Sequence, residues 1–428
     1  MQRDVTRLRN IGILNSVDAG NATCRERIFE LVGGVGAANE ESSAPLVGRN
    51  VSPASSVTWS PRTGPFAEEP AALTFVAHAP RVLDGVVFIL DGARGTAETG
   101  DAALRDTCAR RVPCIVFIDD AGKHEDFEAM VDALELELGM TAVPVHLPWN
   151  DERGANVIDI LQQRLVIGPD TGPERELRPV PPAAEETVGR IRRRIVDICA
   201  EFDDAIHGAS AAGLDVGADE LARALRKATL TRDARVLVVT CGSVRAGRGV
   251  GSLLDALVTY LPSPTERPPV FGVDPRRSVD VARFAREGDA FAATVFATTD
   301  VPALGRLTWL RIYSGTIDVS ATVAVLPRDD RGRIERIFLP DVRGMLEVNS
   351  AGPGAVVCVT GVVDANPGDT LSCVRAPVVL DEAHAPGRAA PSPTMVDGAA
   401  PFMSTMASVA RNLRSAPMSS TGSRRTPP

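Results

Sequence analysis

The chain has 428 residues, of which 44% are hydrophobic, and its formal net charge at pH 7 is -9. The length predicts two or three domains, and the apolar content is sufficient to build their cores. A negative net charge excludes a global cationic field that would attract nucleic acid, so we expect no DNA partner and only local patches for RNA.

The cysteine, histidine and hydropathy patterns indicate the compartment. The seven cysteines are odd in number and form no CxxC pair, and the five histidines are dispersed. This pattern predicts free thiols in a reducing cytoplasm and no bound metal. Residues 1–10 lack the apolar core of a signal peptide, and no apolar run is long enough to span a bilayer. We therefore expect a cytoplasmic protein without a membrane partner.

The first region alternates between predicted strands and helices. Residues 9–20 are predicted to form a strand that runs into a loop, whereas 37–72 are rich in Gly, Ser, Pro and Ala and are interpreted as loop or partly disordered. The apolar runs Val86–Leu90 and Cys114–Ile118 are continuous, which is typical of strands buried on both faces of a parallel sheet. The other predicted elements are helices over 22–32, 97–111, 125–138 and 250–260 and a buried strand over 236–240. This alternation indicates a doubly wound α/β sheet.

Residues 144–232 interrupt the alternation and are interpreted as an insertion. Within them, 187–206 are predicted to form an amphipathic helix, and 219–229 a shorter one. The apolar face of the longer helix consists of Val188, Ile191, Ile195, Ile198 and Phe202. Residues 262–288 are rich in Pro and Arg and are interpreted as a linker.

The pattern changes again after the linker. Residues 289–382 contain short alternating strands (FAATVF, LTWLRIY, TVAVLP and AVVCVTGV) that are separated by Gly, Pro and Asp turns. This spacing predicts a small β-barrel. From about 383 the chain is rich in Pro, Ala, Ser and Arg, a composition that predicts a disordered tail because too little apolar surface is present to order it.

Four ordered segments carry a resemblance to a known family. The segment from Arg9 to Ile28, RNIGILNSVDAGNATCRERI, resembles the phosphate-binding segment of translation elongation factor G, RNIGI-(M/I)-AHIDAGKTTTTERI. RVLDGVVFILDG at 81–92 resembles the family's RVLDGAV strand. CGSVRAGRGVGSLLDALVTYLPSP at 241–264 resembles the segment that carries its fifth guanine-loop motif. GRLTWLRIYSGTI at 305–317, with PGDTL at 367–371, resembles its second domain.

This resemblance implies a fold and a domain plan. We expect a P-loop NTPase-type doubly wound sheet over residues 1–272, with an inserted subdomain at about 144–232. A translation-factor-type β-barrel is expected over 285–382 and a disordered tail over 383–428. The family's activity is GTP hydrolysis with magnesium, and its partners are the ribosome and other translation factors. The family's nucleotide-binding positions, interpreted here as vestigial, are Asp18, Ala19, Gly20, Asn21, Ala22, Thr23, Asp119, Asp120, Gly122, Cys241, Gly242 and Ser243.

The phosphate loop departs from the family where charge is needed. A phosphate loop works because backbone N–H groups surround the phosphates, a lysine neutralises them and a hydroxyl ligates magnesium. Here the lysine position is Asn21 and the hydroxyl position is Ala22. Thr23 is one residue too late, because one step along a helix rotates a side chain by about 100°.

The third and fourth motifs are also altered. The family's DTPGH, which supplies a magnesium-linked Asp and a water-positioning His, is absent, and His78 is interpreted as a loop residue without a catalytic role. In the fourth motif, NKxD, the Asn braces the loop and the Asp accepts both guanine N–H groups. This chain has Asp119 at the Asn position, Asp120 at the Lys position and Gly122 at the guanine-binding position.

The remaining motifs retain less chemistry. The fifth motif survives in outline as Cys241, Gly242 and Ser243, whose backbone is still able to contact a base. The switch I threonine corresponds to Asn50. Hydrogen bonds to charged groups contribute roughly 1.5–3 kcal/mol each. Losing four would therefore remove about 6–12 kcal/mol if they were additive, whereas a micromolar ligand has only about 8 kcal/mol of binding free energy.

We therefore interpret the chain as a pseudo-GTPase without catalytic residues or a bound cofactor, which binds the ribosome or a translation factor. The family's three further domains are missing, so a translocase is not expected. Barrel arginines such as Arg306 and Arg311 are either RNA contacts or, in the favoured interpretation, solvated residues of a strand face. Two alternatives remain: a GTP-binding enzyme in which Arg25 or Arg245 replaces the lysine charge and GTP or GDP binds with magnesium, and a decayed paralogue without a selected role.

Overall fold

The computed structural model describes residues 4–15, 54–59, 62, 65, 71–76, 82–98, 102–109, 111–121, 127–151, 154–168, 170, 176–231, 234–301, 304–341 and 344–380. All of them belong to one compact unit, Met1–His384. The predicted helix over 22–32 and the predicted tail over 383–428 lie outside the described residues. Among the described residues, no helix is both long and apolar enough to cross a membrane.

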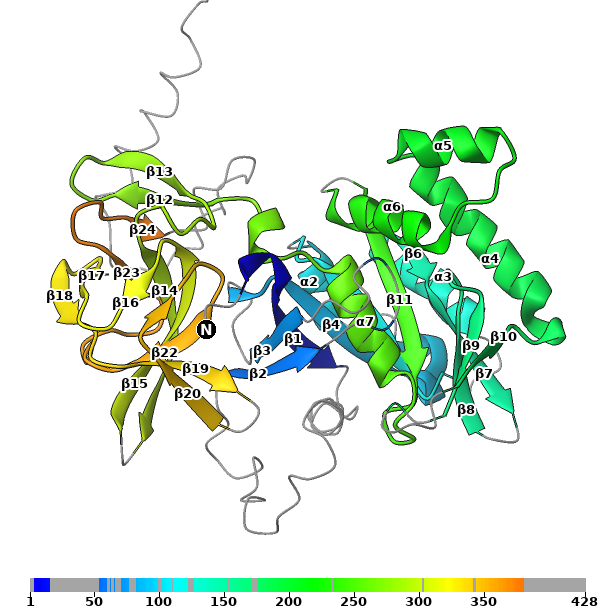
Figure 1. Cartoon of the computed structure of the whole chain (residues 1–428), viewed down its shortest axis with the longest axis horizontal. Helices are drawn as coiled ribbons and strands as arrows, with labels where there is room; N and C mark the ends of the chain where they lie inside the picture. Colours follow the sequence, from blue (N-terminus) through cyan, green and yellow to red (C-terminus); the bar gives the residue numbers. More distant parts are fainter. Residues whose placement is uncertain are drawn as a thin grey trace, which may run out of the picture. The chain divides into compact units, whose positions relative to one another are not determined.

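The first part of the unit is built on a seven-stranded sheet with the order β2-β3-β1-β4-β5-β11-β6 (Figure 1). All neighbouring pairs are parallel except β2–β3, which is antiparallel. The strands are β1 (Leu8–Asn15), β2 (Ala54–Trp59), β3 (Ala71–Val76), β4 (Gly85–Asp91), β5 (Cys114–Asp119), β6 (Thr141–Pro144) and β11 (Val236–Gly242). The predicted doubly wound α/β class is confirmed.

The central strands form because their side chains are apolar on both faces. Every residue of β11 is buried, and so is every residue of β4 except Asp91. Such strands are stable only when helices cover both faces of the sheet. The accompanying helices are η3 (Gly92–Glu98), α2 (Ala102–Ala109), α3 (Phe127–Leu138) and α7 (Val250–Tyr260). The bounds of α7 agree with the prediction, whereas α2 is shorter than the helix expected over 97–111 because η3 precedes it.

The insertion contains a second sheet as well as helices. Four antiparallel strands have the order β10-β9-β8-β7. Their bounds are β7 (His146–Asp151), β8 (Gly154–Asp159), β9 (Arg164–Ile167) and β10 (Glu176–Pro179), and the helices are α4 (Pro182–Ala200), α5 (Asp204–Ala211) and α6 (Ala218–Leu230). The helix predicted over 187–206 is thus two helices, with Phe202 in the turn between them. The insertion shares one apolar core with the large sheet, so it is packed onto that sheet.

The second part of the unit is β-rich. An eight-stranded antiparallel sheet has the order β18-β17-β23-β14-β15-β22-β19-β20. Strands from both halves of this order, β17 and β19 among them, contribute to one apolar core, so the sheet curls around it. The strands are β14 (Ala292–Val301), β15 (Gly305–Ser314), β17 (Thr322–Leu326), β18 (Asp330–Arg333), β19 (Ile337–Asp341), β20 (Gly344–Val348), β22 (Val356–Val359) and β23 (Thr370–Cys373), with β16 (Ile317–Asp318) and β21 (Ser350–Ala351) forming a separate pair.

Two segments that were expected to lack regular structure contain strands. β2 lies within 37–72, where its Ser- and Thr-rich sequence gives a weak strand signal, and it forms by pairing along β3. The expected linker over 262–288 contains η5 (Pro264–Glu266) and the hairpin of β12 (Val270–Asp274) and β13 (Val279–Arg283). β12 pairs with β24 (Val379–Leu380), about a hundred residues later, and a local pattern carries no signal of such a distant partner.

Candidate functional site

The carboxyl ends of the parallel strands meet at one edge of the large sheet, and several predicted site residues lie there. Asp119, the last residue of β5, is in register with Asp91 of β4 on one side and with Gly242 of β11 on the other. Asp120 and Ser243 follow directly on their loops. Ligand sites in open α/β sheets form at this edge. The fourth- and fifth-motif positions are therefore together, as the resemblance implies.

The chain's own hydrogen bonds occupy the two carboxylates of the fourth motif. The carboxylate of Asp119 accepts the backbone N–H of Val244 at 2.8 Å. The carboxylate of Asp120 accepts the hydroxyl of Ser243 at 2.6 Å, and the N–H of Asp120 donates to the carbonyl of Gly242 at 2.8 Å. These bonds tie the loop after β5 to the loop after β11. Asp119 thus braces the loop, the task of the Asn that the family has at this position.

A third loop packs closely against this pair. Gly92 follows β4, and a Cβ atom at its position would lie 2.8 Å from both the Cα of Ala121 and the carbonyl oxygen of Asp119. These neighbours are backbone atoms that have little freedom to move, so a side chain at Gly92 would displace the loop. The close approach brings the carboxyl group of Asp91 to the same edge as the carboxylates of Asp119 and Asp120.

The electrostatics of this edge oppose a polyphosphate. Burial raises the pKa of Asp119, the N–H of Val244 counters that rise, and the negative charges of Asp120 and Asp91 add to it. Arg94 pairs with Asp91 at 3.8 Å across exposed side chains, Arg245 is exposed on the loop after β11, and Arg248, further along that loop, donates to the side chain of Asn156. Neither lysine nor amide stands at the two fourth-motif positions, so the described residues do not fit guanine nucleotide with magnesium.

The other predicted positions contribute differently. Cys241 is fully buried and its side chain belongs to the apolar core, and burial raises the pKa of its thiol far above the usual range. It therefore offers only its backbone to the edge. The phosphate-loop positions from Asp18 to Thr23 lie outside the described residues, as do Gly122, His78, Asn50 and Arg25. No group of metal-ligating side chains is found in the described part of the chain.

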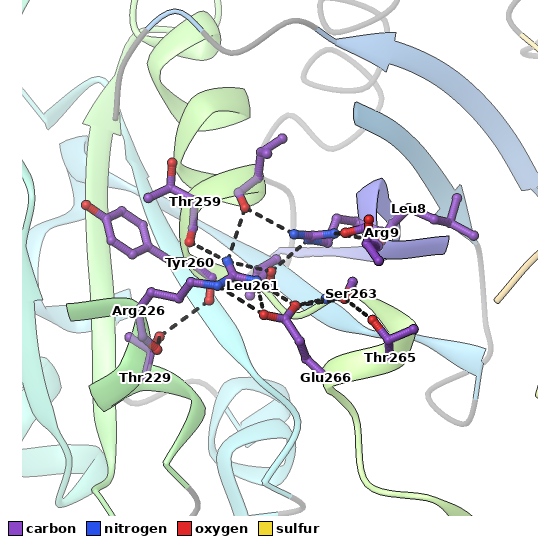
Figure 2. Close-up of polar contacts among 12 residues, drawn as sticks. Leu8, Arg9, Arg226, Thr229, Thr259, Tyr260, Leu261, Ser263, Thr265 and Glu266 are labelled. Atoms are coloured by element: carbon purple, nitrogen blue, oxygen red, sulfur yellow. Dashed lines mark hydrogen bonds and ion pairs between the residues drawn. The ribbon is translucent and has the colours of Figure 1, made fainter. Parts of the chain in front are cut away.

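The opposite, amino edge of the sheet holds an arginine clasp that sequence reasoning missed (Figure 2). It consists of Arg9 on β1, Arg226 on α6 and Glu266 on η5. Arg226 donates from Nη1 to the carbonyls of Val258, Thr259 and Leu261 at the end of α7. Arg9 donates from Nε to the carbonyl of Leu261 at 2.8 Å. The last carbonyls of a helix have no partner within the helix, so these guanidinium groups complete the hydrogen bonding of α7.

Glu266 supplies the negative charge of the clasp and pairs with Arg226. Arg226 donates to both carboxylate oxygens of Glu266, at 2.8 and 2.6 Å, and Glu266 also accepts the N–H and hydroxyl of Ser263. Burial disfavours the charged carboxylate, but these hydrogen bonds outweigh it and lower the pKa of Glu266. Burial and the neighbouring charge of Arg226 lower the pKa of Arg9 to about 10, with Glu266 opposing the shift. The sequence signal that could have pointed to this cluster is the capping box formed by Ser263 and Glu266.

A second buried node lies near the same edge, just before β4. Asp84 accepts the backbone N–H and side-chain amide of Asn10 at 2.9 and 2.6 Å, and Arg311 of β15 at 2.7 Å. Arg311 is 3% exposed, so the expectation of a solvated or RNA-contacting arginine is wrong at this position. Arg306 is half-buried and donates to the carbonyl of Ala365 at 3.3 Å. Arg311 thus links β15 to Asp84 of the α/β part, whereas Arg306 forms its hydrogen bond within the β-rich part.

Comparison with known proteins agrees with this fold. No protein-family model matches the chain. Among solved structures, the crystal structure of a Thermus thermophilus protein, ttk003000868, matches with a TM-score of 0.65 and 20% sequence identity, over 86% of this chain and 54% of the other. The chain therefore spans about half the length of the Thermus protein. At this identity the likeness shows the fold alone, a mostly parallel α/β sheet followed by a β-rich part.

Proposed function

We propose that this chain is an elongation factor G-like, translation-related protein that acts as a pseudo-GTPase. It binds the ribosome or a translation factor through its folded surface and has neither ordinary GTP binding nor GTP hydrolysis. The observation that carries the proposal is the gathering of the Asp91, Asp119 and Asp120 carboxylates at the edge where a guanine base would be selected.

Two physical effects at this edge act against nucleotide. A base N–H group that approached the bonded carboxylate oxygens would compete with the hydrogen bonds from Val244 and Ser243, each of which contributes about 1.5–3 kcal/mol because one partner is charged. The carboxylates of Asp91, Asp119 and Asp120 also give the edge negative charge, which repels polyphosphate in a partly buried setting. Both effects add to the losses that the sequence indicates at Asn21 and Ala22.

The scaffold role is supported by the opposite edge. The clasp at Arg226 and the node at Asp84 fasten α7 and the β-rich part to the sheet without any contribution from the nucleotide edge. The molecule thus has its own means of holding the two parts together. A protein that keeps such a support after losing its ligand chemistry is suited to binding a partner by shape.

One observation favours a second candidate, a GTP-binding protein with unusual ligands. Arg245 is exposed, and it directly follows Val244, which binds Asp119. In this alternative its guanidinium supplies the positive charge that Asn21 lacks. The Arg245→Ala variant separates the two candidates, with Arg276→Ala, an exposed arginine of the β12–β13 turn, as its matched control.

The test measures binding of fluorescent GDP and GTP analogues to the full chain, with and without magnesium. We expect no saturable binding at micromolar concentrations. A restored variant, with Asn21→Lys, Ala22→Thr, Asp119→Asn, Asp120→Lys and Gly122→Asp, is expected to bind more tightly than the natural chain. Saturable, magnesium-dependent micromolar binding by the natural chain would overturn the proposal, and its loss in Arg245→Ala alone would establish the alternative.

Partner binding is tested separately by co-sedimentation with ribosomes at a low and a high salt concentration. We expect association that weakens with salt, since contacts with RNA phosphates release counterions. Absence of association at low salt would count against the ribosome and leave a translation factor as the proposed partner.

A further inference from the structure

A cavity of about 90 Å³ lies where the α/β and β-rich parts of the compact unit meet. Its lining draws on Asp84 before β4, Arg267 after η5, Arg283 at the end of β13 and Arg311 on β15. The residues therefore come from four separate segments that the fold brings together. A buried water needs about 10–15 Å³ of such space, so the cavity has room for a small polyatomic ion.

The charge of the lining is unbalanced. Among the described residues, the lining contains three arginines and Asp84 as its one acidic residue. Arg311 pairs with Asp84 at 2.7 Å, with both side chains less than 5% exposed, so this pair neutralises itself. Arg267 and Arg283 then leave two positive charges without a carboxylate in the lining. Both side chains are half-buried, and positive charge that is partly removed from water without a counter-charge favours an anion as the occupant of the site.

Unused hydrogen-bond donors of the lining arginines also favour a bound anion. Arg311 uses its Nη atoms on Asp84 and on the carbonyl of Gly354, and Arg283 uses Nη2 on the carbonyl of Ala376 at 3.0 Å. The Nε atoms of both arginines are buried and have no hydrogen-bond partner within the described structure. No hydrogen bond from the guanidinium of Arg267 is found among the described residues. Buried donors of this kind normally have partners, so a missing acceptor is implied.

The surroundings of Arg267 disfavour its positive charge, mainly through burial. Burial lowers the pKa of Arg267, Asp84 opposes that shift, and the positive charge of Arg311 adds to it. A dianion between the three guanidinium groups would relieve both the repulsion and the unsatisfied donors. Guanidinium groups match tetrahedral oxyanions particularly well, because their planar forks donate paired hydrogen bonds to phosphate oxygens.

We propose that the cavity lined by Arg267, Arg283 and Arg311 is a binding site for a small oxyanion of the phosphate class. The bound ion joins the α/β part, the segment after η5 and the β-rich part, so it stabilises their arrangement. This site lies at the amino edge, away from Asp119 and Asp120, and the proposal is independent of nucleotide binding.

The test titrates inorganic phosphate into the full chain by isothermal calorimetry, in a buffer without nucleotide or magnesium, and follows the melting temperature in parallel. We expect saturable binding and a rise in melting temperature. Sulfate, which has the same shape, is expected to compete, whereas chloride at the same ionic strength is not. The absence of saturable binding would overturn the proposal.

Two variants localise the site. Arg267→Gln and Arg283→Gln are each expected to weaken phosphate binding roughly tenfold or more, the effect of losing a hydrogen bond to a charged group. Arg276→Gln and Arg277→Gln, on the exposed turn between β12 and β13, are the matched controls and should bind as the natural chain does. Equal weakening in the control variants would mean general charge attraction and would contradict a built site.

The melting temperature in phosphate-free buffer gives a second test of the role of Arg267. Because Arg267→Gln removes a charge that burial disfavours, it should melt at the same or a higher temperature than the natural chain in phosphate-free buffer, and phosphate should raise its melting temperature less. A lower melting temperature with an unchanged phosphate response would assign Arg267 a structural role instead. Arg267→Lys, which keeps the charge but loses the fork, should give an intermediate response.

Discussion

The two edges of the large sheet differ in how their polar residues are used. At the amino edge, two guanidinium groups have carboxylate partners, Arg226 with Glu266 and Arg311 with Asp84, whereas Arg267 and Arg283 have none in the lining of their cavity. At the carboxyl edge, Asp91, Asp119 and Asp120 gather like charges, and each carboxylate accepts a hydrogen bond from a backbone N–H group or from Ser243. The comparison shows that polar residues at the amino edge hold parts of the molecule together. At the carboxyl edge, the carboxylates of Asp119 and Asp120 accept hydrogen bonds from the molecule's own loops.

The largest expected effect is on the amino edge, in Arg226→Ala. This change leaves Glu266 without its cation and the carbonyls at the end of α7 without donors. Breaking a buried ion pair in this way costs about 3–5 kcal/mol, and the partial exposure of Glu266 places the expectation at the lower end. The free energy of unfolding by urea measures it. Arg223→Ala, an exposed arginine on the same helix, is the control, with an expected change within about 0.5 kcal/mol.

The next effect concerns the node between the two parts of the unit. Arg311→Met removes the partner of a fully buried carboxylate, and we expect a loss of about 3 kcal/mol. The accompanying Asp84→Asn substitution should recover part of that loss, because it removes the uncompensated charge. Unfolding of both variants and of Arg331→Met, an exposed arginine on β18, gives the comparison. Equal effects at Arg311 and Arg331 would show that the ion pair contributes nothing.

Sequence patterns predicted the framework well and its long-range polar contacts poorly. The apolar runs of β4 and β5 and the periodicity of α7 depend on local burial, so their positions could be predicted. Arg311 was assigned to a solvated face because its strand alternates. Its partner Asp84 lies 227 residues earlier in the sequence. The local sequence of a strand does not show which distant segment packs on its outer face.

At the candidate site, the sequence predicted which residues lie together but not the hydrogen bonds between them. The alignment of motifs brought Asp119, Asp120 and Ser243 into one hypothesis, and the parallel sheet explains why, since strand ends meet at one edge. The hydrogen bonds that Asp119 accepts from Val244 and Asp120 accepts from Ser243 were not predicted. They depend on the exact approach of the loop after β11 and on the left-handed backbone of Asp120, which has a φ of 55°.

The smallest predicted effect is a gain of stability at the carboxyl edge. Asp119→Asn keeps an acceptor for Val244 and removes a carboxylate that burial, Asp120 and Asp91 all disfavour. We expect the variant to be more stable by about 0.5–1 kcal/mol at neutral pH. Urea unfolding measures the gain, and Asp132→Asn, an exposed carboxylate on α3, is the control.

The gain should depend on pH with a defined sign. Because the folded-state pKa of Asp119 is raised, the folded protein holds its proton more tightly, and stability falls as pH rises from the ordinary Asp pKa of 3.8 through the folded value. The advantage of Asp119→Asn is therefore absent below that window, appears across it and is complete above it. A constant advantage at all pH values would contradict the repulsion that we assign to this edge.

The most direct test of the central claim is a calorimetric titration of the full natural chain with GTP in the presence of magnesium. The account predicts no saturable heat at micromolar concentrations, with the restored five-substitution variant binding more tightly under the same conditions. Saturable, magnesium-dependent binding of GTP by the natural chain at micromolar concentrations would contradict it.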